Sequence, residues 1–312
     1  MNSPINQHYV PQGILRNFQI QNKKGKEKCI YVFDKSNCKE YQSPIRKIAT
    51  ERYFYEVNYK DQEISIENEL EKYESTSIPI IQKIISNRSL KSITKKEKLA
   101  LSKFICLQLT RVPATRNKFV NLADFFDKEL NYFQSMGVSR PNEVDDKIIH
   151  FEFIMDTISK FTPLIYNKDW LLCESINENY FIGDNPVVLN NTFNKNQNGI
   201  GLKSLGVEIY MPISPNYCLL LICNSVRKSI KNMLNHPITN IKDEPAVDKL
   251  ISFKQQLKRN ETVVQSKENV IFANFLQYSY AERFIYSHKL DFSLPKEILS
   301  KNGYKKNSIQ FY

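Results

Sequence analysis

The stretch TKKEKLALSKFICLQLTRVP, residues 94–113, predicts a long helix in the middle of the chain. Thr94 and Glu97 have the spacing of a capping box, in which each side chain bonds to the other residue's backbone N–H at a helix start. Pro113 lacks a backbone N–H, so we expect the helix to end or kink near Arg111. Apolar residues recur on the face that we expect to be buried: Leu101, Phe104, Ile105 and Leu109.

Further helices are expected on both sides of this stretch. Residues 64–85 carry apolar side chains at helical spacing before and after Pro79, which predicts an amphipathic pair of helices. A short helix is expected after Pro11, because proline suits the first position of a helix. The remaining helical patterns cover residues 117–136, 144–162, 246–258 and 268–282.

Strand patterns lie toward the two ends of the chain. KCIYVFDK, residues 28–35, alternates its side chains as a strand in a sheet does, and a second strand is expected over Tyr53–Tyr55. After Pro163 the sequence changes to short apolar runs separated by Pro, Gly and Asn. These runs predict strands at 169–175, at 180–191, within 206–224 and at 283–287.

The order of these elements predicts an α+β fold, with a central helical region packed on a mostly antiparallel sheet built from both ends of the chain. With 312 residues, 41% of them hydrophobic, the chain is long enough to bury a sizeable core. No repeat, low-complexity tract or clear linker divides it. We expect one domain over residues 1–312, and keep as an alternative two intimate subdomains, 1–163 mainly helical and 164–312 mixed sheet and helix.

The composition suggests a cytoplasmic protein with a basic surface. The net charge is +11, which suits nucleic acid as a partner because basic side chains release counterions from phosphates. The alternative is a lysine-rich solvated surface encoded by an AT-rich genome. No secretory signal is present, nor an apolar run near the roughly 18 residues that a membrane span needs. Six cysteines without CxxC spacing indicate neither a disulfide framework nor a zinc ribbon.

The opening run His8–Gln12, HYVPQ, followed by Leu15–Phe18, LRNF, resembles the signature of the bacterial family called domain of unknown function 4238. The resemblance covers nearly the whole chain, and where we expect a small hydroxyl residue before the Asp-Asn-Pro motif this chain has Gly183. It implies a shared fold and candidate positions but no activity, because the family carries no agreed one. The further matching motifs are residues 31–35, 51–55, 108–116, Trp170 with 181–186, 212–215 and 283–287.

His8 opens this signature and is a candidate general acid or base, since histidine titrates near neutral pH. The alternative is a structural histidine that donates a hydrogen bond to a backbone carbonyl. Tyr9, Phe18 and Trp170 could stack on bases, as aromatic residues do in proteins that bind single strands. Their alternative role is to fill the core.

Three arginines lie inside the quoted motifs: Arg16, Arg111 and Arg116. A guanidinium binds phosphate or carboxylate in a bidentate manner and stays charged, which makes these residues candidates for anion recognition. Gln108 lies one helical turn before Arg111, so we expect both side chains to face a common pocket. The alternative is a set of internal ion pairs with Glu67 and Glu71.

Asp184 and Asn185 follow an apolar strand, at a position where loops carry sites in many folds. A tight turn alone also explains this motif, because Asp and Asn bond to nearby backbone groups. Glu67, Glu71 and Asp184 could supply carboxylates for a magnesium ion, as a nuclease requires, but no nuclease motif or phosphate-binding loop is present. The sequence therefore assigns neither a metal site nor a cofactor.

Two functional interpretations from different classes stay open. In the first, the protein acts on nucleic acid, for example as a phosphodiester-cleaving toxin or defence effector with a basic phosphate-binding pocket. In the second, it is a non-catalytic binding module, and its charged motif residues form a buried structural network. In the first interpretation the catalytic residues are His8 and Asp184, and the substrate-binding residues are Gln12, Arg16, Gln108, Arg111, Arg116 and Asn185.

Overall fold

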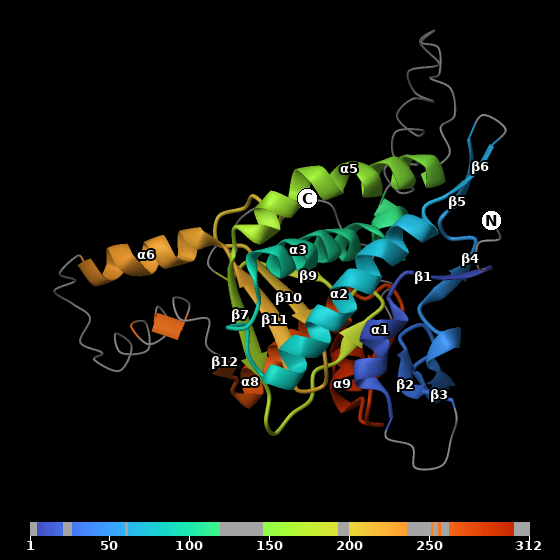
Figure 1. Cartoon of the computed structure of the whole chain (residues 1–312). Helices are drawn as coiled ribbons and strands as arrows, with labels where there is room; N and C mark the ends of the chain where they lie inside the picture. Colours follow the sequence, from blue (N-terminus) through green and yellow to red (C-terminus); the bar gives the residue numbers. More distant parts are fainter. Residues whose placement is uncertain are drawn as a thin grey trace, which may run out of the picture.

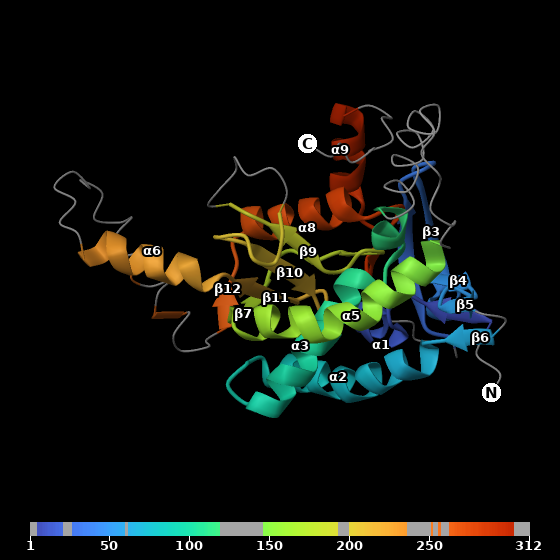
Figure 2. The same cartoon turned by 90° about the horizontal axis from the view of Figure 1, so that it is seen from above.

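The structure is a computed structural model of the chain, and it confirms an α+β fold with mostly antiparallel sheets. Figures 1 and 2 show a central sheet with helices α2, α3 and α5 on one side and α8 on the other. No helix in the described part of the chain combines the length and hydropathy that crossing a bilayer requires. The described residues are 5–20, 27–59, 62–118, 146–192, 200–235, 251, 255–256 and 262–302.

The helix expected from the capping box is α3, Lys95–Thr110. Thr94 accepts a hydrogen bond from the backbone N–H of Glu97, and the Glu97 carboxylate accepts one from the N–H of Thr94, so the box is confirmed. Helix α3 packs against α2 and α5. Leu101, Phe104 and Ile105 are buried as expected, whereas Leu109 is half-buried. The other long helices are α2 (Glu67–Asn87), α5 (Asp146–Tyr166), α6 (Asn224–Asn235), α8 (Lys267–Tyr280) and α9 (Ser293–Asn302).

The expected pair of helices over residues 64–85 is wrong, because α2 continues through Pro79 as one helix. A proline inside a helix removes one backbone hydrogen bond and crowds the preceding turn. Buried residues lie on both sides of it in the same stripe, so packing against α3 holds the two halves in line. The helices expected at 117–136 and 246–258 fall largely outside the described residues.

A five-stranded sheet lies beneath the helical layer, in the order β12-β7-β11-β10-β9. Neighbouring strands in this sheet run antiparallel, except for β12 and β7, which run parallel. Since side chains alternate between the faces of a strand, Trp170, Leu172 and Leu219 join the large core cluster with α3, while Cys173 and Cys218 face α8. Its strands are β7 (Asp169–Glu174), β9 (Val188–Asn190), β10 (Glu208–Pro212), β11 (Tyr217–Ile222) and β12 (Thr262–Val264).

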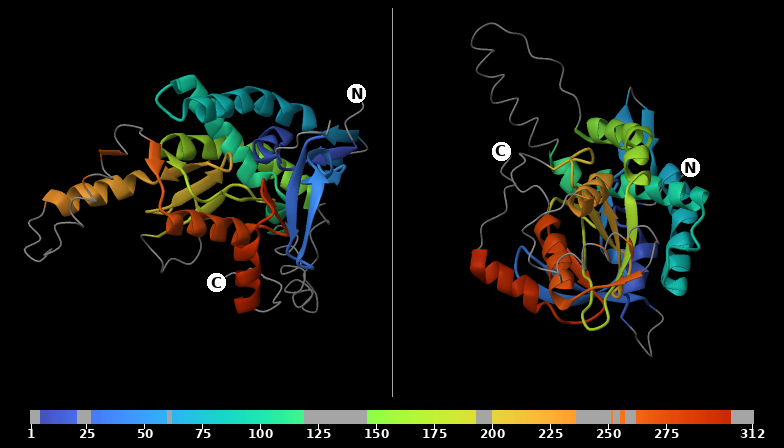
Figure 3. Two further views of the ribbon diagram at one scale, coloured as in Figure 1. Left: turned by 90° about the horizontal axis from the view of Figure 1, so that it is seen from below. Right: turned by 90° about the vertical axis from the view of Figure 1, so that its left-hand side faces the viewer.

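A second sheet of four strands joins the two ends of the chain, in the order β3-β2-β13-β8. Tyr31–Asp34 of β2 pair antiparallel with Phe284–Ser287 of β13, as expected for a sheet built from both ends. Figure 3 shows these strands to one side of the central sheet, with α9 nearby. The strands are β2 (Cys29–Asp34), β3 (Lys39–Pro44), β8 (Ile182–Gly183) and β13 (Phe284–Ser287).

Two small strand pairs complete the architecture around the N-terminus. Strand β1 (Asn6–His8) pairs with β4 (Thr50–Arg52), and β5 (Glu56–Tyr59) pairs with β6 (Gln62–Ser65). Directly after β1 come the short helix α1 (Gln12–Leu15), which follows Pro11 as expected, and the 3-10 helix Arg16–Phe18.

The segment 180–191, expected as one strand, divides between the two sheets. Strand β8 pairs with β13, whereas β9 pairs with β10. The Asp-Asn-Pro motif lies between them, and Pro186 has no N–H to donate to a sheet. The motif therefore marks the passage of the chain from one sheet to the other.

The largest buried cluster takes residues from both halves of the chain, including Ile30, Leu107, Trp170 and Tyr286. The aromatic residues considered for base stacking belong to it: Tyr9, Phe18 and Trp170 are 6%, 0% and 5% exposed. The indole N–H of Trp170 donates to the carbonyl of Ile165 at 3.2 Å. All three side chains fill the core.

Candidate functional site

The signature segment at the N-terminus is bound to helix α3 through its own backbone. Gln108 donates from Nε2 to the carbonyl oxygen of Tyr9 at 2.7 Å. Arg111 donates from Nε to the same oxygen at 3.2 Å and from Nη2 to the carbonyl of His8 at 2.8 Å. The hydroxyl of Tyr55 also donates to the carbonyl of Arg111 at 3.2 Å. Gln108 and Arg111 therefore point the same way, as their spacing predicts, but they meet the backbone carbonyl of Tyr9 rather than a pocket.

Arg111 lies in the core with 1% of its side chain exposed. Its Nη2 also forms an ion pair with Oε1 of Glu74 at 2.7 Å, and its guanidinium lies 5.7 Å from the centre of the Tyr55 ring. Burial alone would lower the pKa of Arg111, but Tyr55 and the Glu74 carboxylate outweigh it and raise the pKa. The arginine is therefore charged, and its partner is Glu74 rather than the expected Glu67 or Glu71.

Glu67 stands one helical turn before Glu71 and lies near the same guanidinium. Burial raises its pKa from 4.5 to about 7, and Arg111 opposes this rise while Glu74 adds to it. Its Oε2 is buried and has no hydrogen-bond partner within the described ranges. The carboxyl group of Glu67 therefore lies beside an arginine that already binds another carboxylate, that of Glu74.

His8, Gln12 and Arg16 lie together at the outer end of this segment. Arg16 is exposed and donates to Oε1 of Gln12 at 3.3 Å. Burial lowers the pKa of His8, a hydrogen bond with the backbone of Ile45 opposes the shift, and the charge of Arg16 contributes to it. The Nε2 atom of His8 is buried and has no partner in the part of the chain that the structure describes. The imidazole is thus neutral at physiological pH.

Arg116 has different partners, on the neighbouring strand β4. Its Nη2 binds both carboxylate oxygens of Glu51 at 2.9 and 2.8 Å, and its guanidinium lies 4.3 Å from the centre of the Phe54 ring. The adjacent Asn117 donates to Glu282 at 3.0 Å. This segment therefore links the first small strand pair to the chain just before β13.

Asp184 lies at the junction of the two sheets and is 3% exposed. Its carboxylate accepts hydrogen bonds from three consecutive backbone N–H groups, those of Glu282, Arg283 and Phe284, at 2.8, 2.7 and 2.8 Å. Burial raises its pKa to about 6, against the lowering effect of the three amides. Asn185 donates to the carbonyl of Tyr280 at 3.3 Å, so both residues fasten the turn to the end of α8.

Gly183 occupies the position where the family pattern led us to expect a hydroxyl residue. A Cβ atom there would lie 3.2 Å from both the Cβ of Ala281 and the carbonyl oxygen of Gln277. The backbone N–H of Gly183 donates to the side-chain oxygen of Gln277 at 2.9 Å. In this chain the close approach of α8 therefore leaves little room for a side chain before Asp184.

The candidate residues thus form two groups. His8, Gln12, Arg16, Gln108 and Arg111 surround the N-terminal segment, whereas Arg116, Asp184 and Asn185 bind elsewhere. Within the described residues no hydrogen bond or ion pair joins the carboxylate of Asp184 to His8. The same part of the chain contains no group of three or more His, Cys, Asp or Glu arranged to hold a metal ion.

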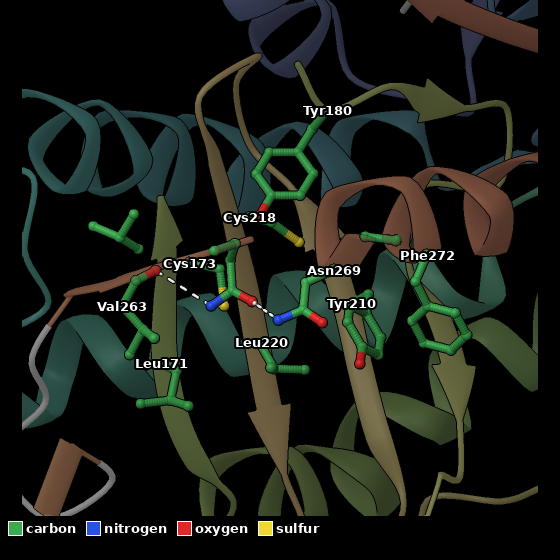
Figure 4. Close-up of a pocket in the computed structure, with 12 residues that line it drawn as sticks. Leu171, Cys173, Tyr180, Tyr210, Cys218, Leu220, Val263, Asn269 and Phe272 are labelled. Atoms are coloured by element: carbon green, nitrogen blue, oxygen red, sulfur yellow. Dashed lines mark hydrogen bonds between the residues drawn. The ribbon is translucent and has the colours of Figure 1, made fainter. Parts of the chain in front are cut away.

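A pocket that the sequence did not indicate lies between the five-stranded sheet and helix α8. It has a volume of about 240 Å³, and Figure 4 shows Cys173, Cys218 and Leu220 on its sheet side, with Tyr210 and Phe272 at one end. Cys173 and Cys218 are directly opposite each other on neighbouring strands. The only sequence signal for it is the alternation in DWLLCE and YCLLLI, which places these side chains on one face once the register is known.

The family-model comparison matches residues 6–291 to the family described as protein of unknown function (DUF4238). The chain belongs to this family. The hydrogen bonds around Tyr9 and Asp184 lie within the matched range. No curated protein and no solved structure matches the chain. The description of DUF4238 names no activity, so the function has to be argued from the chemistry of the structure.

Proposed function

We propose that the protein is a non-catalytic binding module, and that its charged signature residues form an internal network that fixes the fold. Gln108 and Arg111 donate hydrogen bonds to backbone carbonyls of the chain itself. Asp184 accepts hydrogen bonds from backbone N–H groups. Arg111 and Arg116 each bind a carboxylate as well. These contacts support a structural role for Arg111, because a site for phosphate would leave its donors free. Arg116 binds Glu51 through Nη2 alone, and its buried Nη1 has no partner among the described residues.

The environment of Arg111 is the observation that carries this proposal. A phosphate that captured its guanidinium would have to displace Glu74 and two backbone carbonyls. Leaving a buried charge uncompensated costs about 3–5 kcal/mol, and each stranded buried polar group adds about 1–3 kcal/mol. The guanidinium is therefore far better suited to holding β1 and α2 on α3 than to binding a solvent-borne anion.

Removing Arg111 tests this role. We expect Arg111→Ala to lower the free energy of unfolding by about 3–5 kcal/mol, because it strands Glu74. The matched control is Arg46→Ala, which removes an exposed ion pair with Glu27 and should cost less than about 1 kcal/mol. A stable Arg111→Ala protein with weaker nucleic-acid binding, and a salt dependence reduced by about one counterion, would favour a phosphate contact instead.

A second candidate function rests on the other end of the signature. His8 offers a neutral, half-buried imidazole whose Nε2 is unpartnered in the described structure, and the exposed Arg16 lies near it. A neutral imidazole can accept a proton from an attacking hydroxyl while an arginine holds the phosphate. This arrangement supports a protein that acts on nucleic acid, as a phosphodiester-cleaving toxin or defence effector would.

Nuclease activity separates the two candidates. If the second candidate holds, the purified protein cleaves labelled RNA or DNA, with and without added Mg²⁺, and His8→Gln abolishes cleavage while leaving the unfolding midpoint unchanged. Arg16→Ala should then raise KM for the nucleic acid. If wild-type protein cleaves neither substrate, the phosphodiester-cleaving function is rejected.

We also propose that the protein is located in the cytoplasm. All six cysteines are free in the structure, and two of them, Cys173 and Cys218, face each other across neighbouring strands without a bond. Unpaired thiols in such close register suit a reducing compartment.

A further inference from the structure

We propose that the pocket between the five-stranded sheet and α8 binds a small, uncharged, planar heteroaromatic molecule. This inference deepens the proposed binding function, because it gives the module a ligand. It rests on three properties of the pocket: a lining without charge, the Tyr180 hydroxyl directed into it, and aromatic and sulfur-bearing walls.

The lining excludes charged ligands. None of the residues around the pocket is Asp, Glu, Lys, Arg or His. A charged group that enters such a site loses its hydration and gains no counter-charge, which costs several kcal/mol. A volume of about 240 Å³ is also small for a ligand pocket, and suits one or two fused rings. The ligand is therefore compact and neutral.

The hydroxyl of Tyr180 supplies a hydrogen bond at the inner end of the pocket. Tyr180 is 1% exposed, and Figure 4 shows its hydroxyl pointing toward Cys218 and the pocket. No hydrogen bond between described residues involves this hydroxyl, and it is not among the buried unpartnered atoms, so it is open to the pocket. A ligand with a ring nitrogen or carbonyl at this end would satisfy it.

The mouth of the pocket offers a complementary group. The Nδ2 atom of Asn269 donates to Oε1 of Gln265 at 3.0 Å, and Nε2 of Gln265 donates to the carbonyl of Val263 at 3.3 Å. These two bonds fix the carboxamides and direct the Asn269 side-chain oxygen to serve as an acceptor. A ligand can accept a hydrogen bond from the Tyr180 hydroxyl at one end and donate one from an N–H to the Asn269 oxygen at the other. A nitrogen heterocycle carries both kinds of group.

The walls favour a flat ring. Tyr210 and Phe272 meet edge to face with their centres 6.2 Å apart, and the Tyr210 hydroxyl is already bound to Glu208 at 3.3 Å. The thiols of Cys173 and Cys218 lie on the sheet side, and sulfur packs favourably against aromatic rings. Phe272 is 39% exposed and Val264 57%, so a ring in the pocket would cover apolar surface that now faces solvent.

The test uses two neutral probes, benzimidazole and adenine, with adenosine monophosphate as the charged counterpart of adenine. Binding of each to the full chain is measured by calorimetry and by saturation-transfer NMR. We expect at least one neutral probe to bind, and the nucleotide to bind no better than adenine because its phosphate finds no counter-charge in the lining. Tyr180→Phe removes only the hydroxyl and should weaken probe binding by about three- to tenfold.

Two further variants make the result specific to the pocket. Ala273→Leu places a larger side chain in the lining and should abolish probe binding, whereas Tyr286→Phe changes a buried tyrosine of the other sheet and should leave it unchanged. Thermal unfolding of each variant confirms that it is folded. Failure of both neutral probes to bind at about 1 mM, or equal binding by Tyr180→Phe and Ala273→Leu, overturns the ligand assignment. Those outcomes leave the Arg111 stability result untouched, so the two proposals fail separately.

Discussion

The carboxylate of Asp184 accepts a hydrogen bond of 2.7 Å from the backbone N–H of Arg283, a residue 99 positions along the chain. The side chain of Arg283 in turn binds Asp34 of β2 through Nε and Nη2, at 3.0 and 2.6 Å. The Asp-Asn-Pro motif, β13 and β2 are thereby joined through one arginine. This relationship ties the passage between the two sheets to both ends of the chain.

Replacing Asp184 should therefore be costly. Asp184→Ala removes the buried acceptor of three part-buried backbone hydrogen bonds, worth about 1 kcal/mol each, so we expect the free energy of unfolding in urea to fall by about 3 kcal/mol. Asp184→Asn keeps one acceptor oxygen, so its free energy of unfolding should lie between those of Asp184→Ala and wild type. Asp156→Ala, which removes an exposed pair with Lys160, serves as the control and should change stability by less than about 1 kcal/mol.

The stability of the protein should depend on pH through Glu67. Its pKa is 4.5 in its ordinary environment and about 7 in the folded protein, so the folded state binds a proton more tightly than the unfolded state does. The contribution of Glu67 to the free energy of unfolding is then greatest below pH 4.5, and it is lost as the pH rises from 4.5 through about 7. Urea unfolding between these limits should show a smaller loss for Glu67→Gln than for wild type.

Glu69→Gln is the matched control for that series, because Glu69 lies on the same helix with its carboxylate exposed beside Lys72. It should follow the wild-type pH dependence. If Glu67→Gln and wild type lose stability in parallel, Glu67 does not hold its proton in the folded state.

We expect the two halves of the chain to form one cooperative unit. A fragment of residues 1–163 lacks β13, which pairs with β2, and the strands that cover the buried face of α3. It should show no cooperative unfolding transition by circular dichroism. Limited proteolysis near residue 163 that released two stable, separately folded pieces would instead support two subdomains.

Local interactions of the fold could be predicted from the sequence. The capping box of Thr94 and Glu97 needs residues only three apart, and the β2 strand pattern is carried by its own alternation. The same holds for the shared direction of Gln108 and Arg111, one turn apart on α3. These features depend on periodicity, which the sequence contains directly.

Contacts between distant segments could not be predicted in this way. Glu67, Glu71 and Glu74 occupy one face of α2, and the crossing of α2 over α3 decides that Glu74 meets Arg111. The pocket likewise depends on the register that places Cys173 opposite Cys218. Registers and helix crossings result from the packing of the whole core, so no single motif carries them.

The pair of Arg111 and Glu74 gives the most direct test of the structural network. Urea unfolding of Arg111→Met, Glu74→Gln and the double variant forms a double-mutant cycle for these two contacting side chains. We predict that Arg111→Met costs about 3 kcal/mol or more, and that the double variant loses at least about 1 kcal/mol less than the sum of the single losses, because neither charge is then left alone. Additive losses within about 0.5 kcal/mol, or an Arg111→Met protein as stable as wild type, would contradict the account.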